Sequence, residues 1–346
     1  MPQVIFKGIE NLYYLLKEKK TPQFLLVCDS SFPFLTVKER ITNIGIPHIT
    51  FNDFSSNPLH SDARKGLKIL IDNKIKTIVA IGGGSSIDVA KCIKLDSNME
   101  DIEIIAIPTT AGTGSESTKF IVVYEDNKKQ SLGKDSVIPD YVIIEPAVLK
   151  TLPLYQKKCT IMDALCQSIE SYWSINANDV SKSISLKAMK KIKDNMDKYI
   201  LENDESIYRD ILEAANLSGQ AINITQTTAP HAMSYKITSL YNFPHGHAVA
   251  VCLPYVWDKM LNYKKMNDIF DSISKVLGYD NPAETINWFK NKLYEYELYY
   301  PVSDRYEEDI NILTESVNQI RLKNNPVQFN KKELEELYRE IIRHES

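Results

Sequence analysis

The chain has 346 residues, 43% of them hydrophobic and 25% charged, so it is long enough for two domains and has the composition of an ordinary folded protein. Its formal net charge of -4 gives no long-range attraction to nucleic acid or to an anionic membrane, which favours a small-molecule partner. The apolar runs end well before the roughly 20 residues of a membrane span, and the first residues lack a secretory signal pattern, so we expect a cytoplasmic protein.

Up to about Glu145, short β-branched runs alternate with amphipathic, lysine-rich segments, the pattern of parallel strands joined by crossover helices. We expect strands at Phe24–Asp29, His48–Asp53, Thr77–Ile81, Glu103–Pro108 and Tyr141–Ile144. We expect helices near Phe34–Ile44, Ser61–Asn73 and Ser85–Ile93. Between the last two strands, Ser117–Tyr124 and the turn signal at Glu125 to Asn127 predict a β-hairpin. The first domain, residues 1–152, is therefore predicted to be α/β with a parallel sheet.

Beyond Pro153 the pattern changes to helical periodicity, and Pro153 itself disfavours helix at Leu152. We expect helices at Cys159–Ile175, Ser181–Ile200 and Ser206–Ile224, followed by several shorter ones. The second domain, residues 153–346, is predicted to be all-helical. The five cysteines are scattered without paired spacing, so we expect reduced thiols in the core.

A glycine-rich turn follows the third predicted strand. Gly82, Gly83 and Gly84 come directly after Ile78–Ile81 and before an amphipathic segment. Such a turn presents backbone N–H groups at a helix N-terminus, where they and the helix dipole hold a phosphate. Consecutive glycines also allow positive φ angles and the close approach of a pyrophosphate. An ordinary tight turn is the alternative, because the third glycine comes earlier than in the usual dinucleotide fingerprint.

Two further features lie at the carboxyl ends of predicted strands, the edge where parallel sheets bind ligands. The polar loop Pro108–Glu116 offers hydroxyl groups and two glycines. Asp29 ends the first strand, where its carboxylate can accept a hydrogen bond from a ribose 2′-hydroxyl and repel a 2′-phosphate. NAD(H) is therefore preferred, and NADP(H) stays open because an aspartate at this position is also a common helix cap.

A cluster of metal-binding side chains is predicted in the helical domain. Three of the six histidines fall within one short stretch, namely His231, His245 and His247. Upstream, Asp163 and Gln167 have the i, i+4 spacing that places both on one helix face, with Glu170 near it. One carboxylate and two imidazoles suit a divalent ion with open positions for water and substrate. Buried, hydrogen-bonded histidines are the equally weighted alternative.

These motifs together resemble the iron-containing (group III) alcohol dehydrogenase family. The resemblance rests on Gly82–Asp88, Pro108–Glu116, Asp163–Leu165, His231 and His245–Gly246, and it extends from about Phe24 to Asp258. It implies an N-terminal Rossmann-like dinucleotide-binding domain and a C-terminal helical metal-binding domain. The expected cofactors are NAD(H) and a divalent metal, Fe(II) or Zn(II).

The resemblance also implies roles for individual residues. The metal ligands would be Asp163, His231 and His245. The pyrophosphate would lie on Gly83, Gly84 and Ser85, with Thr109, Thr110 and Thr113 near the cofactor and with Asp88 and Lys129 facing it. Two positions depart from the family pattern, since Gln167 and Tyr235 stand where many members have histidines. A neutral amide is a poorer metal ligand than imidazole, so we expect Gln167 to bind the metal weakly or to act indirectly.

Within the family, residues 163–174 and 231–236 resemble phosphonoacetaldehyde reductases of phosphonate biosynthesis. The expected reaction is hydride transfer to a small aldehyde that the metal polarises, with Tyr235 in the proton relay. Lys236 is the nearest basic candidate for phosphonate oxygens, although an exposed helix lysine is the simpler interpretation. A dehydroquinate synthase-like lyase and a metal-poor nucleotide-binding protein without turnover are the alternatives, and a homodimer is left open.

Overall fold

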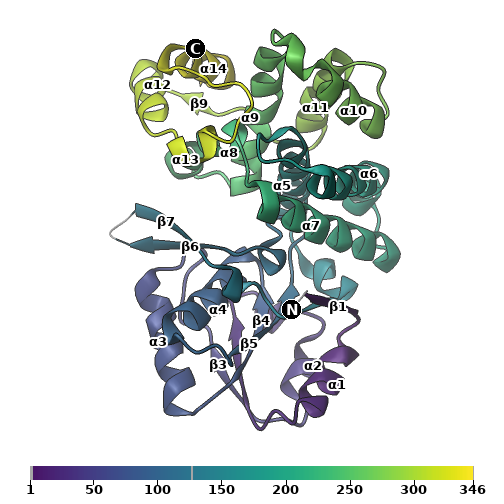
Figure 1. Cartoon of the computed structure of the whole chain (residues 1–346), viewed down its shortest axis with the longest axis vertical. Helices are drawn as coiled ribbons and strands as arrows, with labels where there is room; N and C mark the ends of the chain where they lie inside the picture. The colour runs from purple at the N-terminus through teal and green to yellow at the C-terminus, as the bar shows by residue number, and fades with distance from the viewer. Residues whose placement is uncertain (1–2, 126–127, 346) are drawn as a thin grey trace. The chain divides into compact units, whose positions relative to one another are not determined.

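The computed structural model describes residues 3–125 and 128–345, with the backbone alone for Lys128 and Lys129. It divides into two compact units, which are considered separately (Figure 1). Unit 1 contains the residues up to Pro153 together with Leu201–Gly219, and unit 2 contains Leu154–Ile200 and the residues from Gln220 onward. The chain therefore returns once to unit 1 before it completes the helical unit.

Unit 1 is built on a six-stranded parallel sheet with the strand order β1-β8-β5-β4-β2-β3. The strands are β1 (Val4–Lys7), β2 (Phe24–Cys28), β3 (His48–Phe51), β4 (Thr77–Gly82), β5 (Glu103–Pro108) and β8 (Tyr141–Ile144). Strands β2 and β4 are buried along their whole length, as continuous apolar runs in a parallel sheet should be. The parallel sheet predicted from the sequence is confirmed, and β1 is an additional edge strand that was not predicted.

The helices of unit 1 cover both faces of this sheet. They are α1 (Glu10–Glu18), α2 (Lys38–Thr42), α3 (His60–Asp72) and α4 (Gly84–Ser97). The strand order advances from β1 to β3 and then reverses from β3 to β8, so right-handed crossovers place α1 and α2 on one face and α3 and α4 on the other, as Figure 1 shows. The reversal leaves β4 and β2 side by side at a topological switch point, the position at which open α/β sheets bind ligands.

In unit 1, the structure confirms the predicted β-hairpin but not the predicted extent of the helix near Phe34–Ile44. The hairpin is present as β6 (Phe120–Glu125) paired antiparallel with β7 (Lys128–Gly133), while the turn residues Asp126 and Asn127 lie outside the described residues. The helix expected near Phe34–Ile44 is wrong in extent, because Leu35 is extended with ψ 135° between the 3-10 turn Phe32–Phe34 and α2.

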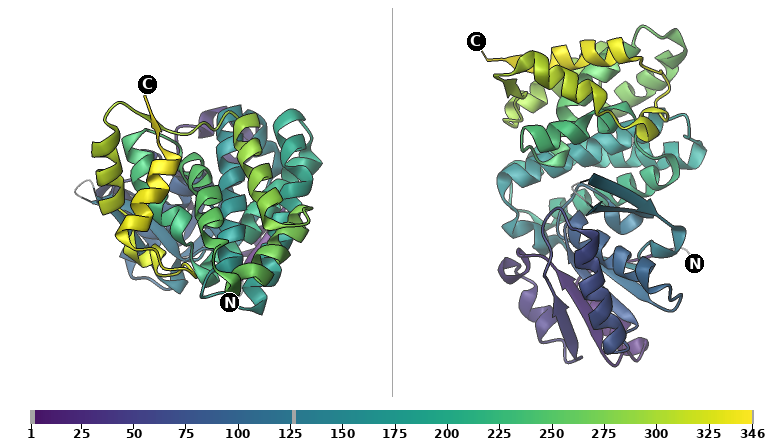
Figure 2. Two further views of the ribbon diagram at one scale, coloured as in Figure 1. Left: turned by 90° about the horizontal axis from the view of Figure 1, so that it is seen from above. Right: turned by 90° about the vertical axis from the view of Figure 1, so that its left-hand side faces the viewer.

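Unit 2 is a bundle of helices around a nearly all-buried central helix, α9 (His245–Met260) (Figure 2). The others are α5 (Leu154–Trp173), α6 (Asp179–Leu201), α8 (Ala229–Leu240), α10 (Asn267–Leu277), α11 (Pro282–Glu295), α12 (Tyr306–Glu315), α13 (Gln319–Leu322) and α14 (Lys331–Ile341), with α7 (Glu205–Thr225) shared between the units. The core includes an aromatic cluster in which Trp173 meets Trp257 and Phe270 edge to face. Beside the helices, the described part of unit 2 contains the two-residue strands β9 (Val302–Ser303) and β10 (Arg343–His344).

Two chain-wide expectations can be compared directly with the structure. All five cysteines are free and buried, which confirms the prediction of core thiols. None of the helices among the described residues combines the length and apolarity that crossing a membrane requires.

Candidate functional site

The glycine turn lies at the switch point of the sheet. Gly82 ends β4 with φ +154°, and a Cβ there would come within 2.1 Å of the Ser86 hydroxyl and 2.6 Å of an Asp29 carboxylate oxygen. Gly83 occupies the N-cap position of α4, so the N-terminus of this 14-residue helix opens at the switch point. Only a residue without a side chain fits at Gly82, and the turn has the backbone that phosphate binding needs.

The polar loop after β5 packs against this turn. A Cβ on Gly83 would lie 3.5 Å from Thr110 Cγ2, and one on Gly84 would lie 3.0 Å from Thr113 Oγ1. The backbone N–H of Thr109 donates to the carbonyl of Gly82 at 2.9 Å. The structure thus brings the three predicted threonines to the glycine turn, and Thr113 packs tightly enough that a side chain at Gly84 would have to displace it.

Asp29 and Ser85 flank the same turn. Asp29 Oδ1 accepts from the Ser31 backbone N–H at 2.8 Å, and its Oδ2 accepts from the Ser86 hydroxyl at 2.9 Å. The hydroxyl of Ser85 donates to the Ser56 carbonyl at 2.5 Å. The carboxylate of Asp29 therefore lies beside Gly82 at the carboxyl end of β2, and its contact with a ribose remains a prediction.

Asp88 has internal partners rather than a face toward the switch point. It is buried and accepts from the Ser115 hydroxyl, from the backbone N–H of Val122 at 2.9 Å and from the Lys91 ammonium at 3.5 Å. Its cofactor contact remains a prediction. So does that of Lys129, which lies on β7 opposite Tyr124 and whose side chain is outside what the structure describes.

In unit 2, three helices converge on a candidate metal centre. One ligand atom each from Asp163 in α5, His231 in the first turn of α8 and His245 at the start of α9 all lie within 4.8 Å of one another. Gly246 makes this possible, because a Cβ there would meet the Cys159 carbonyl at 2.1 Å and Asp163 Cβ at 2.9 Å. The sequence His245–Gly246 therefore pairs a ligand with the residue that lets its helix approach α5.

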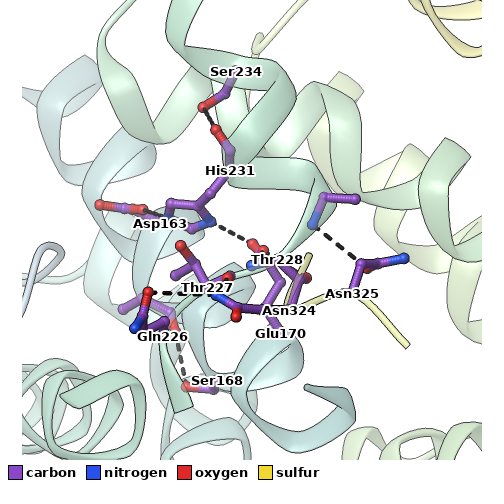
Figure 3. Close-up of polar contacts among 12 residues, drawn as sticks. Asp163, Ser168, Glu170, Gln226, Thr227, Thr228, His231, Ser234, Asn324 and Asn325 are labelled. Atoms are coloured by element: carbon purple, nitrogen blue, oxygen red, sulfur yellow. Dashed lines mark hydrogen bonds and ion pairs between the residues drawn. The ribbon is translucent and has the colours of Figure 1, made fainter. Parts of the chain in front are cut away.

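Glu170 holds His231 in one orientation (Figure 3). His231 Nδ1 hydrogen-bonds to Glu170 Oε1, and the other carboxylate oxygen accepts from the backbone N–H of Thr228 at 2.7 Å and from its hydroxyl at 2.9 Å. Glu170 is fully buried, and the N-terminus of α8 adds a favourable dipole. A carboxylate on one imidazole nitrogen leaves the other, here Nε2, to face Asp163 Oδ1 at 3.4 Å, which is the usual arrangement for a metal-binding histidine.

Asp163 carries an unsatisfied acceptor. Its Oδ1 is buried and makes no hydrogen bond within the described structure, with His231 Nε2 3.4 Å away. Burial raises the pKa of this carboxyl, but His231, His245 and the hydrogen-bonded Gln167 outweigh the burial and bring the pKa below its ordinary value. A buried, ionised oxygen without a donor is costly, and a cation placed between the three ligand atoms would satisfy it. Gln167 contacts Asp163 itself, in keeping with the indirect role expected for it.

Tyr235 lies against the same cluster, one helical turn after His231. Its ring stacks on His245 with centroids 5.8 Å apart, and its hydroxyl is hydrogen-bonded to Arg321. Burial raises the pKa of the Tyr235 phenol, although Arg321 opposes this. The hydroxyl therefore stays protonated near neutral pH. Lys236 is the next residue of α8, about 100° further around the helix, and is partly exposed.

His247 belongs to the structure of unit 2 rather than to the metal cluster. Its Nε2 donates to the Tyr299 carbonyl at 2.9 Å, so Nδ1 is unprotonated and accepts from the Tyr155 hydroxyl at 2.8 Å. Its ring stacks on Phe243 at a centroid distance of 4.1 Å. Burial lowers the pKa of His247. With both nitrogens engaged, this histidine offers no lone pair to a metal.

The donor set suits a divalent ion of intermediate softness. It combines one carboxylate and two imidazoles, keeps open positions, and includes the orphaned oxygen of Asp163. The three residues predicted as ligands lie together in the structure, whereas the contact of Glu170 with His231 was not predicted. The i, i+7 spacing of Asp163 and Glu170, which places both on one face of α5, was the available signal for Glu170.

Comparison with known proteins places the chain in a family. The model described as iron-containing alcohol dehydrogenase matches residues 2–146, and the model for the C-terminal part of the Fe-containing alcohol dehydrogenase family matches residues 158–342. The chain belongs to the iron-containing alcohol dehydrogenase family, which confirms the resemblance seen in its motifs.

Relatives of known function are distant. An aldehyde-alcohol dehydrogenase of Streptococcus pneumoniae is 26% identical over 344 residues, covering 85% of this chain but 39% of the relative, so the chain spans well under half of that protein. Alcohol dehydrogenase 4 of Saccharomyces cerevisiae is 27% identical over 368 residues, covering 96% of this chain and 95% of the relative. The solved structure of a sulfoacetaldehyde reductase from Bifidobacterium kashiwanohense, in complex with NAD+, has the same fold with a TM-score of 0.90, 24% identity and coverage of 98% and 97% of the two chains.

Proposed function

We propose that the protein is a metal-dependent, NAD(H)-dependent alcohol dehydrogenase that works as an aldehyde reductase, converting phosphonoacetaldehyde to 2-hydroxyethylphosphonate. The observation that carries the proposal is the cluster of Asp163, His231 and His245, whose ligand atoms lie within 4.8 Å of one another and include the buried Asp163 Oδ1, which makes no hydrogen bond in the described structure. Family membership supports the reaction class. The sequence of residues 163–174, which resembles phosphonoacetaldehyde reductases, supports the substrate.

The residues divide the work as follows. Asp163, His231 and His245 would hold the ion, and Glu170 keeps Nδ1 of His231 occupied so that Nε2 is presented. When bound, a divalent ion supplies Lewis-acid polarisation of a carbonyl oxygen, and a reduced nicotinamide supplies the hydride. The phenol of Tyr235 retains its proton because burial raises its pKa, so its oxygen can donate that proton toward the alcohol product.

The proposed binding of NAD(H) rests on residues of unit 1. The glycine turn, the N-terminus of α4 and the threonines around it support pyrophosphate binding. Asp29 supports NAD(H) over NADP(H), because a carboxylate at the end of β2 would repel a 2′-phosphate. The five free cysteines support a reducing, cytoplasmic setting.

A substrate panel tests this function. The purified protein is reconstituted with Fe(II) or Zn(II) and offered phosphonoacetaldehyde and simple aldehydes with NADH and with NADPH, while absorbance at the NADH wavelength is followed. We expect sustained, stoichiometric oxidation of NADH, faster than that of NADPH. A lyase of the dehydroquinate synthase type would show no net NADH consumption, and a nucleotide-binding protein without turnover would bind NADH and reduce nothing.

A further inference from the structure

His60, Cys92 and Asp96 form a second cluster of metal-binding side chains, located in unit 1. One ligand atom from each lies within 4.8 Å of the other two. His60 begins α3, and Cys92 and Asp96 stand on α4 with the i, i+4 spacing that places both on one helix face. Among the described residues, this cluster and the candidate metal centre of unit 2 are the two places where three such side chains come so close.

The close packing of α3 against α4 brings the three side chains together (Figure 1). Gly66 of α3 permits this packing, because a Cβ there would come within 2.5 Å of Ile93 Cδ1 on α4. His60 Nε2 lies 2.8 Å from Asp96 Oδ2, and the two side chains are 18% and 22% exposed, whereas Cys92 is fully buried. The cluster therefore has a thiol at its base and an imidazole and a carboxylate that solvent can reach.

The position of Asp96 favours a cation at this cluster. Asp96 stands in the last turn of α4, which ends at Ser97, and the negative end of the helix dipole disfavours an anion there. His60 balances this carboxylate only while its imidazole is protonated. A divalent ion held between the three ligand atoms would supply the positive charge with the imidazole neutral, because a histidine binds a metal through a nitrogen lone pair.

We propose that His60, Cys92 and Asp96 bind a Zn(II) ion through an imidazole, a thiolate and a carboxylate, with a water molecule in the fourth position. Thiolate and imidazole ligands together favour Zn(II) over Mg(II), Ca(II) and Mn(II). Zn–S bonds of about 2.3 Å and Zn–N or Zn–O bonds of about 2.0 to 2.2 Å place tetrahedral ligand atoms about 3.3 to 3.7 Å apart. Side-chain movements on the order of 1 Å therefore complete the site. The ion would join the start of α3 to the end of α4.

This site should fill after the candidate metal centre of unit 2. The fully buried thiol of Cys92 must give up its proton when zinc binds, which lowers the affinity at neutral pH. The ligand residues of unit 2 are one aspartate and two histidines, so no thiol proton has to be released there. The first equivalent of metal should therefore occupy unit 2, and the second should occupy unit 1.

Titration of the reduced, chelator-stripped full chain with Co(II) tests the site. A thiolate bound to Co(II) gives a near-ultraviolet charge-transfer band that carboxylate and imidazole ligands do not give, so the band reports the cluster of unit 1 alone. The wild type is compared with Cys92→Ser, His60→Gln and Asp163→Asn. Cys28→Ser is the matched control, because Cys28 is also a buried cysteine of unit 1 but belongs to neither cluster. Circular dichroism checks the fold of each variant, and Zn(II) is then added to displace Co(II).

We expect the band in the wild type and in Cys28→Ser to grow with the second equivalent of Co(II) and to disappear when Zn(II) is added. In Asp163→Asn, where the centre of unit 2 is impaired, the band should grow with the first equivalent. Cys92→Ser should lose the band, and the partly exposed His60→Gln should weaken Co(II) binding by at least about 10-fold. No band in the wild type, a band of full intensity in Cys92→Ser, or unchanged affinity in His60→Gln would overturn the site. No aldehyde or NADH is present, so these results are independent of the proposed reaction.

Discussion

Each unit buries a carboxylate in a helix, but the two carboxylates are neutralised in different ways. Asp88 in unit 1 is paired with the fully buried Lys91, which also donates to the Ser115 hydroxyl at 2.7 Å and to the Phe120 carbonyl at 2.9 Å. Asp163 in unit 2 faces two histidines and has one oxygen without a donor. The first cluster has its own cation and holds the hairpin to α4, whereas the second has the arrangement for which we propose a bound metal ion.

The largest effect is expected where the external cation binds. Asp163→Asn keeps the shape of the side chain but removes the charged ligand, so we expect kcat/KM to fall by more than about 1,000-fold because Lewis-acid stabilisation is lost. Metal content is measured on the same samples. His247→Gln serves as control and should retain its metal, since both nitrogens of His247 are engaged elsewhere. Full metal occupancy in Asp163→Asn would contradict the ligand assignment.

At the cluster of Asp88 and Lys91 in unit 1, we expect a substitution to change the stability of the protein and not its metal content. Lys91→Met leaves Asp88 buried without its cation, which should lower the free energy of unfolding by about 3 kcal/mol or more. Chemical denaturation measures this change, and metal content per folded chain should stay that of the wild type. A loss of metal without a loss of stability would contradict the assignment of a structural role to the cluster in unit 1 and of metal binding to the cluster in unit 2.

A smaller effect is expected when the support of a ligand is altered. Glu170→Gln preserves the size of the side chain but weakens its hold on His231 Nδ1, and losing such support costs about 10- to 100-fold in metal affinity. Competition with a chelator measures the affinity. Unchanged affinity would mean that His231 is oriented by packing alone.

The thermal stability of the metal-free protein should depend on pH because of His231. Burial lowers the pKa of His231, but Glu170 and Asp163 outweigh it and raise the pKa to about 9. Because the pKa of His231 is higher in the folded state than in the unfolded state, protonation of His231 stabilises the fold. This contribution is complete below about pH 6.5 and is lost as the pH rises through about 9. The difference in Tm between wild type and His231→Gln, both with chelator, should therefore shrink from pH 6 to pH 9.5. A difference that grows over this range would contradict the charged pair.

Much of this architecture follows from local sequence signals. The glycine turn and the apolar runs of β2 and β4 predicted the sheet and its ligand edge, because continuous burial and φ requirements act within a few residues. Asp163, His231 and His245 were predicted as ligands because their types and family motifs are distinctive, and the structure brings the three together. The strand β1 was not predicted, although Val4, Ile5 and Phe6 form a short apolar run.

The partners of the site residues could not be predicted in the same way. Lys91 is one of many lysines in the sequence, and only the fold shows that it is fully buried beside Asp88. Arg321 reaches Tyr235 through tertiary packing of α13, which no spacing in the sequence records. Charged side chains brought together over long sequence distances are determined by the packing of helices, and their chemistry therefore appears only in the folded chain.

The central claim is that the cluster in unit 2 holds a metal on which aldehyde reduction depends. The direct measurement is a titration of chelator-stripped protein with Fe(II) or Zn(II), followed by the rate of NADH oxidation with phosphonoacetaldehyde. We predict no turnover in the stripped protein and a rise that saturates near one ion per chain. Equal turnover with and without metal, or none at any metal concentration, would contradict the claim.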